Sequence, residues 1–390
     1  MLERFRRVTR DGRWIPEVDG LRFVAIFSVL LFHMSGELSE RSGRFIPIEP
    51  NYWWLGWLLG NGGRGVTLFF VISGMILALP FARHLLLGAK PVSLHKYYLR
   101  RVTRLEPPYI ASLILAVLLV TVYLHQIQAG ILPHLLASVF YQHNLVFGEM
   151  SAVNPVAWSL EVEIQFYMLA PLAMQCFRIR PAWLRRGVML LSIICISLMQ
   201  EPFQTWPRVE LSILFYLQYF LMGLLVADVF VLDIEGMKSS WLWDIAGIAS
   251  LIAIFCLPGD AYWPHAVMSI PIGVLCISAM RSRGLRRIFA NEWVAVIGGM
   301  CYSIYLLHLL VIAALFKVTR HAILPGALYV VNFSIQLLFT VVPTVAICSV
   351  FFLLVERPCM DPSWPAKLWH LITGRKAIEA AALDTSGISE

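Results

Sequence analysis

The stretch GVTLFFVISGMILALPFARH, residues 65–84, holds a single charged residue, Arg83. A helix that crosses a lipid bilayer needs about 20 mostly apolar residues. The stretch meets this requirement, and it lacks the alternation of apolar and polar residues that is typical of a membrane β-strand. It therefore predicts a membrane-spanning helix.

The composition of the whole 390-residue chain agrees with a lipid solvent. Residues of the AVILMFWYC set make up 59%, charged residues 14%, and the mean hydropathy is +0.72. A soluble domain is about 45–50% apolar and about 25% charged. The chain is therefore not expected to be soluble, disordered or a nucleic-acid binder. Its seven cysteines form no CxxC pair and show no zinc spacing against histidine, so neither a disulfide scaffold nor a metal is expected.

Ten apolar stretches are candidate spans, and the uniform runs predict an all-α bundle of about ten transmembrane helices, good to about one span. The fifth stretch is short, and residues 131–147 suit an interfacial or re-entrant helix. The ten stretches are 19–36, 65–84, 106–125, 157–177, 187–200, 209–232, 241–258, 263–280, 293–316 and 328–355.

The basic residues predict the orientation. With the N-terminus inside, 24 of the 31 Lys and Arg residues lie on the cytoplasmic side and 6 outside, a strong positive-inside bias. Both termini are therefore expected in the cytoplasm. We expect a basic N-terminus at 1–16, one transmembrane domain at 17–358 and a short tail at 359–390. Because the first apolar run ends in GELSE without a cleavage site, we interpret it as an uncleaved span.

Ionisable residues inside these spans are functional candidates, because an unpartnered charge at bilayer depth costs several kcal/mol. In DGLRFVAIFSVLLFH, Arg22 and His33 are eleven residues apart. At about 100° and 1.5 Å per residue they share one helix face, with His33 roughly 16 Å farther along the axis. A neutral imidazole there suits a general base. The alternative is a packed histidine that bonds a neighbouring helix.

A second group lies in NPVAWSLEVEIQFY, residues 154–167. Ser159 and Glu163 are four residues apart and share a helix face, whereas Glu161 points about 200° away. Glu163 suits the orientation of an imidazole, acceptance of a sugar hydroxyl's proton, or a structural ion pair with an arginine. The sequence leaves these alternatives open.

The third group is KYYLRRVTRLEPPY, residues 96–109, on the expected cytoplasmic side. Lys96, Arg100 and Arg104 form an i, i+4 stripe beside Arg101. The plainer interpretation is an anchor on anionic lipid headgroups. The sharper one is a phosphate site for a nucleotide-bearing donor, because arginine binds phosphate oxygens in bidentate fashion.

Three further segments carry polar residues. Ser73 lies in GRGVTLFFVISG, where helix packing alone explains the glycines. Tyr305 and His308 lie in CYSIYLLH, and for His308 we favour a helix–helix hydrogen bond over a role in a site. Glu356 and Arg357 of the terminal VERP are interpreted as a cap at the exit of the last span.

The ordered set of motifs resembles the acyltransferase 3 family of integral membrane O-acyltransferases. The resemblance runs from about Glu17 to Pro358, and the absence of an appended soluble domain points to the stand-alone type. The motifs, in order, are EVDGLR with ten residues to His33, GVTLFFVISG, RVTR, WSLEVEIQFY, SIYLLH and ERP.

The resemblance implies transfer of an acyl group, usually acetyl, from cytosolic acyl-CoA to a carbohydrate or glycolipid hydroxyl, in a bacterial inner membrane. It implies His33 as the base or acyl-accepting residue, Arg22 as its partner, and a catalytic motif pair in Ser159 and Glu163. Contacts to CoA phosphates are implied for Arg101, Arg104 and Arg100. Supporting positions are Ser73, Asp19, Trp158, Tyr305 and His308.

We therefore expect a membrane O-acyltransferase with acyl-CoA as a donor substrate, no permanently bound cofactor and no nucleic-acid partner. The alternative from another class is a multi-span transporter or exporter with a proton-linked His and Glu. A lipid-binding scaffold is the plainest third interpretation. The acceptor glycan, the acyl length and the oligomeric state are left open by the sequence.

Overall fold

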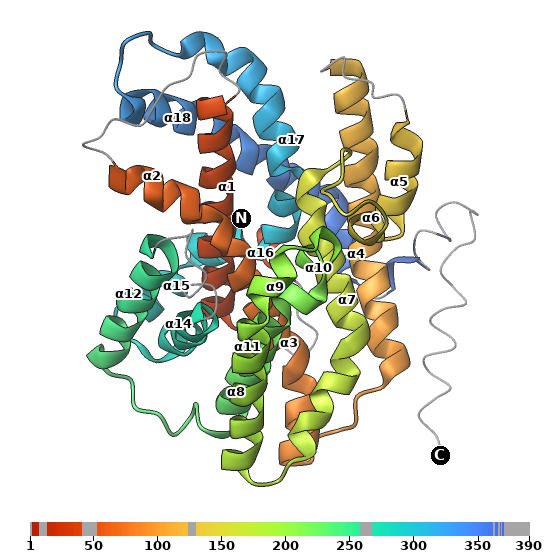
Figure 1. The fold of residues 1–390 in the computed structure, drawn as a ribbon, viewed down its shortest axis with the longest axis vertical. Helices are drawn as coiled ribbons and strands as arrows, with labels where there is room; N and C mark the ends of the chain where they lie inside the picture. Colours follow the sequence, from red (N-terminus) through yellow and green to blue (C-terminus); the bar gives the residue numbers. More distant parts are fainter. Residues whose placement is uncertain are drawn as a thin grey trace.

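The computed structural model describes residues 2–7, 14–40, 53–123, 130–257, 267–361, 363–365, 367 and 369. Within these ranges every regular element is a helix (Figure 1). The ends of the predicted spans 106–125 and 241–258, the start of 263–280, Arg10 and Arg13, and most of the predicted tail lie outside the described residues.

The described helices differ widely in length. The long ones are α1 (Pro16–Glu40), α3 (Gly65–Leu87), α4 (Leu94–Leu118), α11 (Ile213–Leu232), α17 (Cys301–Thr319) and α18 (Tyr329–Phe351). Those of intermediate length are α7 (Trp158–Ala173), α8 (Ala182–Leu198), α12 (Trp241–Cys256) and α14 (Ser269–Arg281). The short ones are α2 (Trp53–Gly60), α5 (Ile131–Val139), α6 (His143–Phe147), α9 (Gln200–Gln204), α10 (Pro207–Glu210), α15 (Leu285–Phe289), α16 (Glu292–Gly299) and α19 (Arg357–Cys359).

Six helical stretches are long and apolar enough to cross a bilayer. They are Pro16–Ser39, Trp53–Leu87, Leu94–Thr121, Pro207–Leu232, Cys301–Ala322 and Tyr329–Cys359. The apolar helices α12 and α14 are shorter, as are α7 with 16 residues and α8 with 17. The all-helical membrane class is thus confirmed in the described residues, whereas the count of ten spans and the cytoplasmic termini stay predictions.

The ninth predicted span, 293–316, is wrong as a single helix. The chain breaks at Met300, between α16 and α17. A Cβ atom on Gly298 would lie 1.8 Å from the carbonyl oxygen of Asp19, so glycine is needed for α16 to approach the beginning of α1 this closely. Hydropathy does not record this contact, because it depends on a helix almost 280 residues away.

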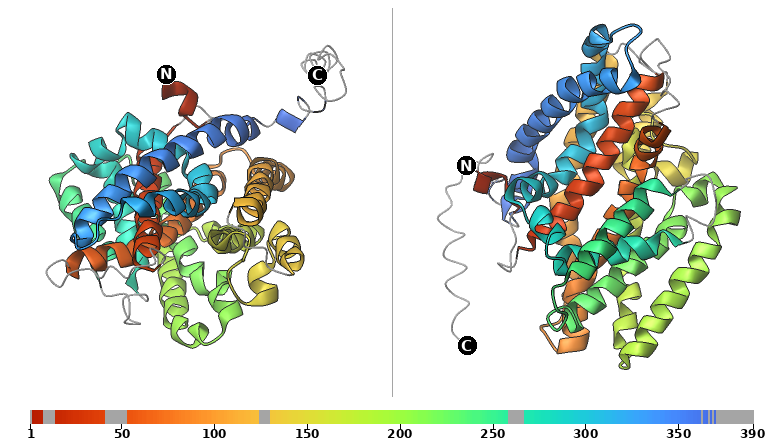
Figure 2. Two further views of the ribbon diagram at one scale, coloured as in Figure 1. Left: turned by 90° about the horizontal axis from the view of Figure 1, so that it is seen from above. Right: turned by 90° about the vertical axis from the view of Figure 1, so that its left-hand side faces the viewer.

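Helix α1 is central to the bundle. It contacts α3, α16 and α17, and α17 in turn packs along α18 (Figure 2). Helix α3, in addition to its contact with α1, packs closely against α11. A Cβ on Gly74 of α3 would lie 2.4 Å from the carbonyl oxygen of Phe220 on α11. These contacts hold α1 and α3 side by side, and the polar residues of both can therefore face one space.

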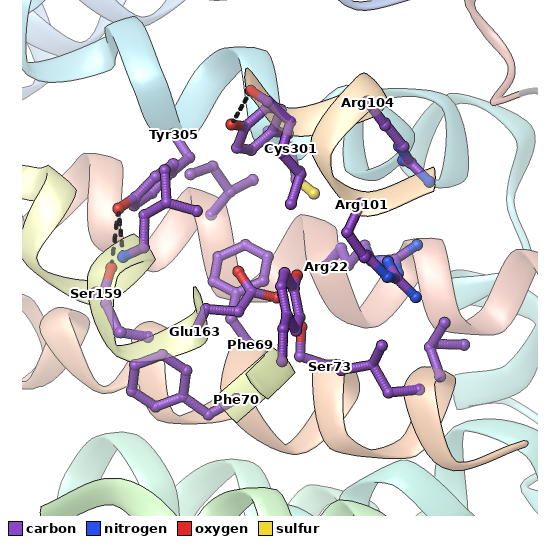
Figure 3. A pocket seen from close by; sticks show the side chains of 18 of the residues that line it. Arg22, Phe69, Phe70, Ser73, Arg101, Arg104, Ser159, Glu163, Cys301 and Tyr305 are labelled. Carbon is purple, nitrogen blue, oxygen red and sulfur yellow. Dashed lines mark hydrogen bonds between the residues drawn. The ribbon is translucent and has the colours of Figure 1, made fainter. Parts of the chain in front are cut away.

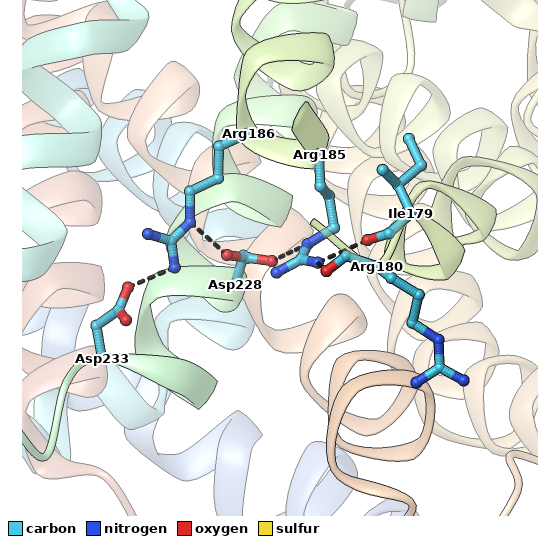
Figure 4. A network of polar contacts seen from close by, with 6 residues as sticks. All are labelled: Ile179, Arg180, Arg185, Arg186, Asp228 and Asp233. Carbon is cyan, nitrogen blue, oxygen red and sulfur yellow. Dashed lines mark hydrogen bonds and ion pairs between the residues drawn. The ribbon is translucent and has the colours of Figure 1, made fainter. Parts of the chain in front are cut away.

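An ion-pair network fastens α8 to α11 (Figure 4). The buried Arg185 donates to Asp228 and, at 2.7 Å, to the carbonyl oxygen of Ile179. Arg186 donates to Asp228 at 2.6 Å and also to Asp233. Because Asp228 is fully buried, its carboxylate needs both guanidinium partners to offset its desolvation.

Candidate active site

The sequence motifs converge on one partly open cavity of about 190 Å³. Seven of the predicted site residues line it: Arg22, Ser73, Arg101, Arg104, Ser159, Glu163 and Tyr305. They come from α1, α3, α4, α7 and α17, so the site exists only in the folded bundle. The three arginines gather toward one end of the cavity, Ser159 and Tyr305 lie toward the other, and Glu163 and Ser73 lie between them (Figure 3).

Glu163 is the polar centre of the cavity. Its carboxylate accepts hydrogen bonds from the Ser73 hydroxyl on α3 and from the Tyr167 hydroxyl at 2.5 Å. Tyr167 is four residues after Glu163 on α7, which places both side chains on one helix face. The predicted alternative of a structural ion pair between Glu163 and an arginine is not found among the described residues.

At the end of the cavity opposite the arginines, the Tyr305 hydroxyl forms three hydrogen bonds. Its hydroxyl donates to the carbonyl oxygen of Val156 at 2.6 Å and accepts from the Ser159 hydroxyl and the Leu160 N–H, both at 3.1 Å. Tyr305 on α17 thus forms hydrogen bonds with backbone groups at the beginning of α7 that have no partner within that helix. The contact sets the position of Ser159 and, one turn later, of Glu163.

At the end of the cavity where the arginines gather, some guanidinium groups are paired with a carboxylate and others are not. Arg22 pairs with Asp19 at 2.5 Å, and Arg7 approaches the same carboxylate at 3.5 Å. Asp19 is therefore the partner of Arg22 and does not itself line the cavity. Neither Arg101 nor Arg104 forms an ion pair with any carboxylate of the described residues, and the buried Nε atom of Arg104 has no hydrogen-bond partner there.

Arg101 is held by aromatic rings instead. Its guanidinium carbon lies 5.2 Å from the centre of the Tyr167 ring and 5.8 Å from that of Tyr97. Tyr97 in turn donates to the backbone carbonyl of Tyr167 at 3.3 Å. This cation–π arrangement orients Arg101 without neutralising its charge.

Arg100 does not belong to this group. Its side chain is exposed and its Nε donates to the carbonyl oxygen of Lys96 at 2.9 Å. The predicted i, i+4 stripe is wrong as a single site, because successive helix residues differ by about 100° and only Arg101 and Arg104 turn toward the cavity.

The two histidines contact each other, and neither is among the residues that line the cavity. The His33 and His308 ring centres are 5.1 Å apart. His308 is buried, and its Nδ1 donates within its own helix to the carbonyl oxygens of Ile304 and Tyr305 at 3.0 and 2.9 Å. Its Nε2 is then the acceptor nitrogen, and it has no hydrogen-bond partner among the described residues. The interhelical hydrogen bond that the sequence favoured for His308 is thus absent there.

Trp158 lies beside the cavity without lining it. Its ring packs edge-on against Phe70, at 6.4 Å between centres, and against Tyr216 at 5.3 Å. Because Phe70 lines the cavity, Trp158 supports the wall.

Sequence reasoning missed Arg7, Tyr167 and Glu356, which also line the cavity. Glu356 is buried, and its Oε2 accepts from the Ser303 N–H at 3.0 Å and from the Ser303 hydroxyl at 2.5 Å. Its Oε1 has no partner in the described part of the chain. The interpretation of Glu356 as an exit cap is therefore wrong, and the ERP motif at the end of the resemblance was the signal that could have indicated it.

Comparison with known proteins identifies the family of the chain. The profile of the acyltransferase 3 family, described as "Acyltransferase domain", matches residues 15–353. The chain therefore belongs to the acyltransferase 3 family, and the resemblance inferred from its ordered motifs is confirmed.

Two similar relatives are named O-acetyltransferase OatA, from Staphylococcus aureus strain NCTC 8325 / PS 47 and strain COL. Each is 25% identical over 334 residues, covering 78% of this chain and 52% of the relative. The chain thus spans about half the length of the curated relatives it matches. No solved structure matches it.

Proposed function

We propose that the chain is a membrane O-acyltransferase that moves an acetyl group from acetyl-CoA to a hydroxyl of a carbohydrate or glycolipid. The observation that carries the proposal is the pair Arg101 and Arg104, which line the same cavity as Glu163 and lack carboxylate partners. Desolvated cations that form no ion pair are costly, and an anionic ligand lowers that cost.

A CoA thioester matches the two ends of the cavity. Arginine forks match the phosphate oxygens of the donor. In the proposal the diphosphate contacts the arginine end while the thioester lies near Glu163. The positive-inside prediction, which places the beginning of α4 at the cytoplasm, supports donor entry from that side.

The reaction needs a group that takes the acceptor's proton. The hydroxyl oxygen bonds to the thioester carbonyl carbon, the C–S bond breaks, and the proton passes through the base to the leaving CoA thiolate. Hydrogen bonds donated by Ser73 and Tyr167 hold the Glu163 carboxylate in a fixed orientation. Glu163 therefore suits orientation, and His33 stays our candidate for the base or for a transient acyl carrier.

Donor binding is tested with the full chain in detergent. We expect acetyl-CoA to raise the melting temperature of the wild type, and Arg101→Ala/Arg104→Ala to abolish the rise. Arg100→Ala is the control: it removes one positive charge from the same helix but outside the cavity, so the rise should persist. A rise lost equally in all variants would indicate general charge attraction and contradict the proposed site.

Chemistry is tested by following labelled acetyl groups from acetyl-CoA to membrane glycans. His33→Ala should bind acetyl-CoA as the wild type does and lose acetyl transfer. A transporter, the alternative function, would show no transfer in the wild type. Full transfer by His33→Ala would remove the assigned role of His33 while leaving the donor site intact, and a labelled adduct on His33 would support a two-step route.

A further inference from the structure

A second cavity, of about 630 Å³, lies between the beginning of α1, the beginning of α12 and the turn that joins α14 to α15. We name it the arginine groove, because Arg283, Arg286 and Arg287 line it and all three are exposed. Its lining contains one carboxylate, Glu17. None of these residues belongs to the candidate active site.

The charges of the arginine groove are unbalanced. Glu17 accepts from Arg286 at 2.8 Å, so this pair is neutral overall. Arg283 and Arg287 form no ion pair with a carboxylate of the described residues. The three arginines outnumber the single carboxylate of the lining, so the groove carries a net positive charge, which favours a phosphate oxygen as the occupant.

The turn that carries Arg283 is held in place before any ligand arrives. The Asp244 carboxylate on α12 accepts three backbone N–H groups, from Arg283, Gly284 and Leu285, each at 2.8 Å. A flexible basic loop would have to lose conformational entropy on binding, whereas this turn is already ordered by its own hydrogen bonds.

The neighbouring surface is apolar. Trp241, which lines the groove, is 59% exposed, and Leu242 and Ile245 after it on α12 are 73% and 64% exposed. A tryptophan between basic residues and an exposed apolar helix is typical of the membrane–water interface. The apolar residues on α12 therefore offer a surface to acyl chains beside the arginines, a combination that a soluble phosphate does not need.

We propose that the arginine groove binds the phosphate of an anionic phospholipid whose chains lie along α12. The lipid bridges α1, through the Glu17–Arg286 pair, to the turn between α14 and α15. The site is independent of the acyltransferase chemistry proposed above.

The test is native mass spectrometry of the full chain in detergent with dioleoyl phosphatidylglycerol or dioleoyl phosphatidylcholine. We expect phosphatidylglycerol to bind the wild type at least tenfold more tightly than it binds Arg283→Gln/Arg287→Gln, and phosphatidylcholine to show no such difference. Arg178→Gln/Arg180→Gln is the control, because it removes the same charge from another exposed segment and should bind as the wild type does. Since neither Arg283 nor Arg287 forms an ion pair within the described part of the chain, the variant should keep its melting temperature.

Equal phosphatidylglycerol affinity of the wild type and the groove variant would overturn the proposal. Displacement of bound phosphatidylglycerol by millimolar inorganic phosphate or adenosine 3′,5′-bisphosphate would also overturn it, because the groove would then be a site for soluble phosphates. A second variant, Trp241→Ala, should weaken phosphatidylglycerol binding and leave binding of inorganic phosphate unchanged.

Discussion

Two adjacent arginine pairs in this protein have opposite surroundings. On α8, Arg185 and Arg186 are both bonded to Asp228, and Arg186 also bonds Asp233 (Figure 4). On α4, Arg101 points into the cavity while Arg100, the next residue, is exposed (Figure 3). The basic segments look alike in sequence.

The difference lies in the supply of carboxylates. Where the fold places a buried aspartate beside an arginine, the guanidinium forms an ion pair that holds two helices together. Where it supplies aromatic rings, as for Arg101, or no ion pair within the described residues, as for Arg104, the charge remains available to a ligand. Ion-pair satisfaction thus separates structural arginines from binding arginines, and the following variants test that separation.

The largest effect is expected at Asp228. Asp228→Asn leaves Arg185 buried with a neutral partner and should cost about 3–5 kcal/mol of unfolding free energy, measured by thermal or denaturant unfolding in detergent. Asp233→Asn is the control: its side chain is 40% exposed, so the cost should be below about 1 kcal/mol. If the two variants had equal unfolding free energies, the buried ion pair between Arg185 and Asp228 would not be a main source of stability.

The two carboxylates of α7 should separate in the same way. Glu161 is buried and accepts the N–H groups of His143 and Asn144 at 3.2 and 2.8 Å, whereas Glu163 faces the cavity. Glu161→Gln should lose about 1–3 kcal/mol of stability and keep acetyl transfer per folded molecule. Glu163→Gln should keep its melting temperature and lose about 100-fold in transfer rate. If instead Glu161→Gln lost acetyl transfer and Glu163→Gln lost stability, Glu161 rather than Glu163 would be the functional carboxylate.

Replacing Arg104 should affect binding and spare the fold. Arg104→Met removes a desolvated charge without an ion pair, so the ligand-free protein should melt at or above the wild-type temperature. Acetyl-CoA affinity should fall by about 10- to 100-fold, corresponding to roughly 1.5–3 kcal/mol for hydrogen bonds to a charged group. Arg185→Met is the comparison and should melt at a lower temperature, because it leaves Asp228 partly unpaired. A destabilised Arg104→Met would show that Arg104 is structural.

The smallest expected effect is a pH dependence at α6. Burial holds the pKa of the His143 imidazole below its ordinary value, and its Nε2 lies 2.8 Å from Nδ1 of His134. The folded protein therefore binds this proton less readily than the unfolded chain, and stability should fall as the pH drops below about 6.5. Melting temperatures between pH 7.5 and 5.5 should decline less in His143→Asn than in the wild type, and parallel declines would exclude His143 as the cause.

Much of the fold could be predicted because hydropathy and capping are local. The candidate spans are mostly helical over the described residues, with interruptions such as Met300. Ser93, Ser212 and Ser240, which hydropathy alone does not single out, stand at helix beginnings, where each accepts a backbone N–H. The break between α16 and α17 could not be predicted, since it depends on the approach of Gly298 to α1.

The sequence indicated candidate residues for the site, but it did not indicate how they are arranged. Periodicity placed Ser159 and Glu163 on one face, and both line the cavity. It also placed Arg22 with His33, yet Arg22 lines the cavity while His33 contacts His308 farther along the helix. A shared face does not mean a shared site when the two residues are three turns apart.

The sequence by itself determined that the solvent is lipid, that the elements are helices and that the chain has the ordered motifs of its family. Those properties depend on composition and on spacings within one helix. Only the tertiary structure decided which arginines are left without counter-ions and that Glu356 lies at the cavity of Arg104, more than 250 residues away. Charge compensation is a contact between helices, and it is fixed only when the helices pack.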